Sequence, residues 1–373
     1  YSVTAAGIQP GTLGNNNLKP SVSAELEAGI DANIFDRVSV VFNYSNTKTK
    51  DAIVSVPLPG VAGFSRQYQN IGELASTYYE LSINANVVNK EDMSWDLGLN
   101  FDTGTQEITN LNGVPPFTRT GLGAVNIFRV EEGLPYGTMY GQSVVKNLSD
   151  LATDATGNVL NFGGSGAAPG GTAAEYSLNA DGFVVKTADI GTASETPLLK
   201  YDAATSQNEV SSIGNTNPDF NVGFTTNFTY KNFSFYALVD WQKGGDIYNY
   251  TRQNLYFNER HIDLETFGAA GKNLQYAQNI YNRAEATDYF VEDGSFVKIR
   301  EVSIAYKLNT KEIGVDFIDS VKFSIAGRNL FTFTDYTGWD PEVAINTNPT
   351  NFRLDEYAYP NLRSFAFIAE IKF

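Results

Sequence analysis

The residue types that carry out most enzyme chemistry are scarce in this chain of 373 residues. It contains no cysteine and a single histidine, His261. Without cysteine, the chain offers no disulfide, no thiol nucleophile and no thiolate metal site. A single histidine in a polar stretch also argues against a histidine metal cluster and against a Ser-His-Asp triad. These counts favour a protein that does no covalent chemistry.

Two further motifs could suggest catalysis or phosphate binding. Asp340 and Glu342 are closely spaced carboxylates in a long polar segment. General acid–base catalysis would require a cleft and a raised pKa, and the sequence indicates neither. Gly244-Gly245 lacks the surrounding strand, glycine-rich loop and helix of a phosphate-binding motif, so a bend at a strand end explains it better. We predict neither an enzyme nor a cofactor or metal site.

Aromatic side chains are the remaining candidates for contact with a solute. Tyr336, Trp339, Tyr357 and Tyr359 lie in one loop near the C-terminus. Aromatic faces stack on sugar rings, so this loop could contact a substrate. The alternative is that the four rings brace the loop.

The segments on either side of this loop alternate between apolar and polar residues. Side chains alternate faces along a strand, so such a segment has one apolar face and one polar face. Residues 319–335 show this pattern, and the final segment places Phe365, Phe367, Ala369, Ile371 and Phe373 on one face. The same alternation recurs at 22–33, 38–44, 79–87, 93–101, 220–230, 233–241 and 296–308, with less regular strands at 124–130 and 136–145. We therefore expect about eleven strands.

The connections between these strands alternate in length. Residues 34–37, 89–92 and 231–232 make short turns, whereas 50–73, 146–217, 244–295 and 336–362 make long loops. An up-and-down membrane barrel has short turns at one end and long loops at the other. A β-sandwich has no reason to place every long connection at one end.

Composition agrees with a membrane barrel. Aromatic residues make up 13% of the chain and charged residues only 18%. The net charge of −16 argues against a nucleic-acid partner, which would select a basic face. A transmembrane barrel hides its apolar surface at every second residue, so it needs no long apolar run. We predict an all-β protein, a transmembrane antiparallel β-barrel of the outer membrane that contacts lipid.

An odd number of strands is informative, because single-chain bacterial barrels have even numbers. Either the count is wrong by one, or residues 1–373 are part of a larger barrel. The absence of an initial Met and of a signal peptide favours a part. Two alternatives stay open: a secreted all-β adhesin or glycan-binding module, and a passive porin of about twelve strands.

Several ordered motifs resemble one family, the SusC/RagA-like TonB-dependent transporters of the outer membrane of Bacteroidota. The motifs are GLP at 133–135 with YG at 140–141, IGNTNPDF at 213–220, GGDIYN at 244–249, EDGSFVKIR at 292–300 with Tyr306, GRNLFT at 327–332, YTGWDPEV at 336–343 and YP at 359–360. The resemblance implies a plugged barrel of about 22 strands, of which this chain is the C-terminal part. The N-terminal plug, the TonB box and the earlier strands are then absent from this sequence.

The resemblance also implies a function and partners. Such proteins import oligosaccharides or peptides with a SusD-like surface lipoprotein, and the TonB-ExbB-ExbD system energises them through the missing N-terminal part. Phe373 would be the terminal aromatic signal that the barrel-assembly machinery reads, and Tyr336, Trp339, Tyr357 and Tyr359 could contact the lipoprotein lid. Residues 178–182 resemble an acidic glycine loop of the family but depart from it at their first positions, so we place no calcium there.

Some side chains are expected to mark the edges of the membrane. Tyr44, Trp241, Tyr306, Phe331 and Phe333 fit the interfacial aromatic girdles of a barrel, although interior packing is an alternative. Lys298 and Arg300 extend the apolar face of residues 302–308. Their charged ends could reach lipid headgroups or pair with inward acids.

Overall fold

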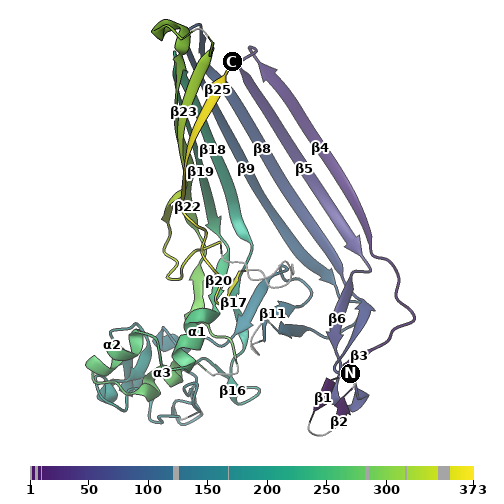
Figure 1. Ribbon diagram of the computed structural model, residues 1–373. Helices are drawn as coiled ribbons and strands as arrows, with labels where there is room; N and C mark the ends of the chain where they lie inside the picture. The colour runs from purple at the N-terminus through teal and green to yellow at the C-terminus, as the bar shows by residue number, and fades with distance from the viewer. Residues whose placement is uncertain are drawn as a thin grey trace.

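The computed structural model describes residues 2–4, 7–9, 11–120, 126–166, 168–281, 285–315, 317–342 and 353–373. One antiparallel sheet of nine long strands dominates it, in the spatial order β25-β23-β22-β19-β18-β9-β8-β5-β4 (Figure 1). In chain order the strands are β4 (Val22–Ile34), β5 (Val38–Lys50), β8 (Glu73–Lys90), β9 (Met93–Asn110), β18 (Pro218–Tyr230), β19 (Phe233–Gly244), β22 (Phe296–Asn309), β23 (Ser320–Phe333) and β25 (Ser364–Lys372). Within the described residues the sheet is not closed, since β4 and β25 each pair with a single neighbour.

The alternation of residue types sets the two faces of this sheet. Cross-strand partners bring like residues together, for example Phe228 opposite Trp95 and Phe235 opposite Ile304. The apolar face stays exposed: Phe323 is 54% and Phe367 79% accessible. No second layer of described residues covers it, so the predicted apolar belt is confirmed. Of the five predicted girdle aromatics, Trp241, Tyr306, Phe331 and Phe333 are exposed, whereas Tyr44 is half-buried and its ring lies 5.3 Å from that of Tyr79.

Short and long connections lie at opposite ends of the sheet. The short ones join β4 to β5, β8 to β9, β18 to β19 and β22 to β23, and they gather with the C-terminus at one end (Figure 1). Phe35 and Asp36 both have positive φ in the first of these turns, as a tight hairpin requires. The predicted alternation of connection lengths is therefore confirmed.

Two of the expected eleven strands do not belong to this sheet. The segments expected at 124–130 and 136–145 contain β11 (Asn126–Val130) and β12 (Thr138–Gly141), and residues 124 and 125 lie outside the described residues. Together with β10 (Phe117–Thr120) and β17 (Ser211–Asn215), they form a separate four-stranded sheet. Their short apolar runs pack into a local core rather than facing lipid, which periodicity alone could not distinguish.

The long connections fold into an outer region, where we expected structureless loops. It contains the helices α1 (Tyr250–Phe257), α2 (Asp263–Ala269) and α3 (Leu274–Ile280). Short strands add to it: β6 (Ile53–Pro57) and β7 (Arg66–Asn70) with β3 (Thr12–Leu13), β13 (Tyr176–Leu178) with β14 (Val184–Lys186), β15 (Tyr201–Asp202) with β16 (Gln207–Asn208), and β20 (Asp246–Asn249) with β21 (Val291–Asp293) and β24 (Leu354–Asp355), while β1 (Ser2–Thr4) pairs with β2 (Gly7–Gln9). None of the described helices is long and apolar enough to cross a membrane.

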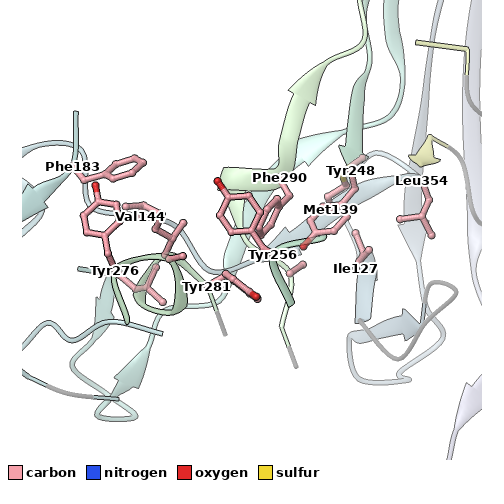
Figure 2. Packing of buried hydrophobic residues seen from close by; sticks show 14 of the residues in the cluster. Ile127, Met139, Val144, Phe183, Tyr248, Tyr256, Tyr276, Tyr281, Phe290 and Leu354 are labelled. Atoms are coloured by element: carbon pink, nitrogen blue, oxygen red, sulfur yellow. The ribbon is translucent and has the colours of Figure 1, made fainter. Parts of the chain in front are cut away.

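An aromatic core holds the outer region together. Tyr248, Tyr256, Tyr276, Tyr281 and Phe290 are buried in one cluster that draws on segments far apart in the chain (Figure 2). Leu354, from β24 in the last loop, joins the same cluster. These contacts tie the three longest connections to one another, so the outer ends of the strands carry a packed module.

Candidate functional site

Ion pairs anchor the last loop, between β23 and β25, to the wall of the sheet. The ammonium of Lys298 on β22 lies 2.6 Å from Asp340 Oδ1 and 2.6 Å from Glu342 Oε2. The Lys298 side chain is only 1% accessible. A buried charge is tolerated when it is paired and hydrogen-bonded, and both carboxylates meet that need here.

An irregularity in β22 sets up this anchor. Opposite β19, Glu301 pairs with Leu238 and Ile299 with Val239, so Arg300 is an extra residue in the ladder. The extra residue shifts the alternation, so Lys298 lies on the polar face, directly opposite Asp240. Of the two expectations for Lys298 and Arg300, pairing with acids is the one observed.

Arg300 completes the network by bridging the wall and the loop. Its Nη2 donates to Asp240 Oδ2 at 2.6 Å, and its Nη1 donates to Glu342 Oε2 at 2.6 Å. From the loop itself, Asn361 Nδ2 donates to the same Glu342 oxygen at 3.0 Å. Planar guanidinium groups suit such multiple carboxylate contacts.

The electrostatics of Glu342 oppose a catalytic role for the carboxylate pair. Burial acts to raise the pKa of Glu342, but hydrogen bonds from Arg300 and Lys298 outweigh it and lower the pKa to about 2. A catalytic acid near neutral pH needs a raised pKa. Asp340 and Glu342 therefore act as paired anions that hold the loop.

The four predicted aromatic residues of the last loop separate into buried and exposed ones. Tyr336 is buried, packs on Ile247 and donates its hydroxyl hydrogen to Asp355 Oδ2. Burial and this hydrogen bond raise the pKa of Tyr336. The ring and hydroxyl are thus occupied in bracing the loop.

The other three rings remain accessible. Trp339 is 79% and Tyr359 98% accessible. Tyr357 is also exposed, and its ring lies 6.5 Å from that of Tyr250 in an edge-on arrangement. Their accessibility is compatible with the predicted contact to a solute or a partner, which stays a prediction for these three rings. Val343, the last residue of the motif at 336–343, lies outside the described residues.

A lysine side chain contacts the loop at 178–182. The ammonium of Lys272 contacts Asp181 Oδ2, and the hydroxyl of Tyr276 donates to the same oxygen. Asn179 Nδ2 donates to Glu195 Oε1 at 2.6 Å. Lys272 lies between α2 and α3, in a different connection, so sequence spacing could not associate it with this loop. Within the described residues no group of carboxylates and histidines is arranged to hold a metal ion.

The polar face of the sheet has two hollows that the sequence pattern did not predict. The larger, of about 440 Å³, lies near the short turns and is lined by Asn84, Asp96 and Thr225. Gly98 also lines it, and a Cβ at that position would come within 2.4 Å of Thr225 Oγ1. The smaller, of about 240 Å³, is lined by Glu80, Asp102 and neighbouring polar residues. The feature of the sequence that points to these hollows is the row of polar residues at every second position of each strand.

Comparisons with known proteins agree with this architecture. A family model described as TonB dependent receptor-like, beta-barrel, matches residues 1–165. TonB-dependent receptor P3 of Formosa agariphila is 30% identical over 96% of this chain and 35% of its own length. TonB-dependent receptor SusC of Bacteroides thetaiotaomicron is 23% identical over 90% of this chain and 31% of its own length. The chain thus spans about a third of the length of these curated relatives.

Solved structures show the same fold. The structure of the RagAB peptide transporter matches with a TM-score of 0.62 at 21% identity, over 94% of this chain and 35% of that chain. The RagAB peptide importer in its open-open state matches with a TM-score of 0.64 over 97% of this chain. Proteins of this kind are outer-membrane β-barrels, and the exposed apolar face of the sheet fits that location. In sequence and in fold, the chain belongs to the TonB-dependent receptor β-barrels of the outer membrane, as its SusC/RagA-like motifs predicted.

Proposed function

We propose that residues 1–373 are the C-terminal barrel portion of a longer transporter that actively imports oligosaccharides or peptides. The unpaired edges of β4 and β25 support a larger barrel, because open sheet edges do not occur in the hydrocarbon of a membrane. The greater length of the relatives supports it too. The N-terminal plug, the TonB box and the earlier strands would lie in the remainder of that protein.

The two-faced sheet is the observation that carries this proposal. One face is apolar and exposed, and the other carries carboxylates, amides and hydroxyls around two hollows. A solute that follows the polar face crosses the membrane without contacting lipid. Gating requires a plug, and the energy would come from the TonB-ExbB-ExbD system of the inner membrane.

A SusD-like surface lipoprotein is the partner we propose at the outer end. The accessible rings of Trp339, Tyr357 and Tyr359 lie on a loop that the Lys298 and Arg300 ion pairs hold in place. A positioned aromatic surface loses little conformational entropy when it binds a lid or a solute. Phe373, which is 81% accessible just after β25, is the proposed assembly signal.

Uptake by cells of the source bacterium tests the proposal. Labelled oligosaccharides and peptides would be followed in the parent strain, in a strain lacking this gene, and in a strain lacking TonB function. We expect accumulation of at least one class of solute to require both the gene and TonB. Uptake that needs the gene but not TonB would indicate a passive porin, and the absence of any uptake defect would refute transport.

The aromatic loop can be tested in the same strains. Replacing both Trp339 and Tyr359 by alanine should weaken uptake or lipoprotein capture, because both rings are accessible. Tyr68→Ala is the matched control, since that tyrosine is also exposed, at 46%, but lies on β7. Equal uptake and equal lipoprotein capture in all variants would remove the loop from the proposed site.

A further inference from the structure

The α-helices of the outer region begin with two different kinds of hydrogen-bond acceptor. At the start of α1 and of α3 the side chain of an asparagine, Asn249 or Asn273, accepts from a backbone N–H of the first turn. At the start of α2 the ring of His261 has this role, because its Nδ1 accepts from the backbone N–H of Asp263 at 3.2 Å. An amide oxygen accepts at any physiological pH, whereas a ring nitrogen accepts only while it is unprotonated. Of these three helices, α2 alone depends on a group that titrates near neutral pH.

The ring of His261 is packed into a network of charged and hydroxyl groups. Its side chain is 18% accessible, and its ring lies 4.9 Å from that of Tyr256, which belongs to the aromatic core (Figure 2). Asp263 Oδ2 lies 3.2 Å from Nδ1 and accepts from Arg252 Nη2 at 2.9 Å. The titratable and charged groups around the ring and this carboxylate are Arg252 and Tyr256 from α1, Asp263 from α2, Tyr289 from η6 (Asp288–Phe290) and Glu292 from β21.

Protonation of the ring disrupts this arrangement. Both ring nitrogens then carry a hydrogen, so Nδ1 stops accepting and presents a donor to the backbone N–H of Asp263. The ring also becomes a second cation beside Arg252. The carboxylate of Asp263 compensates only in part, because it already accepts from Arg252 and from the hydroxyl of Tyr256. The first turn of α2 is therefore held best by the neutral ring.

The protonation equilibrium has the same direction. Burial of the ring is the main reason that the pKa of His261 lies below its ordinary value of 6.5, and Arg252 lowers it further, while Asp263 and Glu292 act in the opposite sense. The folded state thus favours the neutral ring. Its contribution to stability is complete above pH 6.5 and is lost as the pH falls through the lowered pKa.

We propose that His261 is an acid-sensitive latch on α2, which holds the first turn of the helix while the ring is neutral and releases it when the ring is protonated. The latch is a regulatory device that goes beyond the proposed transport. α2 contributes one buried side chain, Phe267, to the aromatic core. Lys272, which follows α2, contacts Asp181 in another long connection. Release of α2 therefore loosens the junction between two connections at the outer end of the sheet.

Amide hydrogen exchange of the full-length receptor at about pH 8 and about pH 5, the range in which histidine titrates, tests the latch. Protection is expressed relative to the unfolded chain at the same pH, which removes the intrinsic effect of pH on exchange. In the parent receptor the protection of the Asp263 amide should fall about fivefold in acid, the size expected for a lost helix cap. The Tyr276 amide, which Asn273 caps, should keep its protection and is the internal control.

His261→Asn is the matched variant, because an asparagine oxygen can accept from the backbone N–H two residues on and does not titrate. Protection of the Asp263 amide in this variant should equal that of the parent at about pH 8 and should stay unchanged at about pH 5. His261→Phe keeps a ring but removes the acceptor, so protection should be low at both pH values.

Three results would overturn the latch. Equal protection of the parent at both pH values would show that protonation does not release α2. A fall that persists in His261→Asn would come from another group, such as Glu285, whose pKa is raised by burial. An equal fall at Asp263 and Tyr276 would mean that acid unfolds the whole outer region. None of these results affects TonB-dependent uptake measured in cells, so the latch and the proposed transport can fail separately.

Discussion

Replacing Lys298 by methionine is the most direct test of how the last loop is held. The substitution keeps an unbranched apolar chain of similar length and removes the charge. It leaves Asp340, whose side chain is 9% accessible, without the ammonium that now lies 2.6 Å from it. Glu342 would retain only Arg300 as its cationic partner. The perturbation is therefore confined to one anchor of the loop.

The size of the effect follows from the burial of the pair. Breaking a buried ion pair costs about 3–5 kcal/mol, since the remaining charge is left uncompensated. Because Arg300 still holds Glu342, we expect the lower end, about 3 kcal/mol, as a loss in the free energy of opening the loop. A loss of that size accelerates exchange through the open state by about a hundredfold.

Amide hydrogen exchange of the full-length receptor can measure this opening. The backbone N–H of Thr337 donates to Glu292 Oε2 at 2.7 Å, and that of Glu342 donates to Asp340 Oδ1 at 2.9 Å. Both amides report on the loop while the strands stay folded. Lys322→Met is the matched control, because its 3.5 Å pair with Glu370 is solvent-exposed and worth at most about 1 kcal/mol. Exchange at Thr337 and Glu342 in Lys298→Met within about fivefold of the control would refute the anchor.

Three further predictions concern pH, packing and assembly. The pKa of Glu342 is lowered from 4.5 to about 2, so its contribution to holding the loop is complete above pH 4.5 and is lost as the pH falls towards 2. The protection of the loop amides from hydrogen exchange should therefore fall across this window, and it should depend less on pH in Glu342→Gln. At Gly104, a Cβ would lie 2.1 Å from the ring of Tyr78, so Gly104→Ala should cost about 1–3 kcal/mol in the free energy of unfolding. Gly223→Ala is its control, because the nearest atom there is 3.9 Å away, and equal unfolding midpoints would contradict the clash. Phe373→Ser should lower the amount of receptor in the outer membrane more than Phe365→Ser does, although both rings are exposed; equal levels in a membrane fractionation would argue against a terminal signal.

Much of the sheet could be predicted from the amino-acid sequence. Alternation at every second residue identified all nine strands and, apart from the upper part of β22, their two faces, because the pleat of a strand converts that period into an apolar and a polar side. The lengths of the connections identified which ends of the strands lie together. What periodicity could not do was separate membrane strands from short strands of a local core, so β11 and β12 were counted with the wall.

The site depended on contacts between distant segments. The extra residue at Arg300 moved Lys298 to the polar face of the sheet. This extra residue is defined by the register with the neighbouring strand, so the sequence of β22 alone does not reveal it. The burial of Tyr336 depended on β20, and the pairing of Asp181 depended on Lys272, far along the chain. The same applies to the folded outer region, whose helices are short and are stabilised by packing rather than by a strong local pattern.

The order of apolar and polar residues along each strand assigned most side chains to the apolar or the polar face, because that choice is local to the strand unless an extra residue interrupts the ladder, as at Arg300. The register between strands was not local, and only the folded sheet decided that Glu80 stands opposite Asp102 and that Lys298 reaches Asp340. Charges separated by many residues interact once hydrogen bonding between strands places them a few ångströms apart, and Coulomb energies depend on that distance. The faces of the sheet are therefore largely determined by the sequence of each strand, whereas the pairing of its charges and the loop anchor are products of tertiary structure.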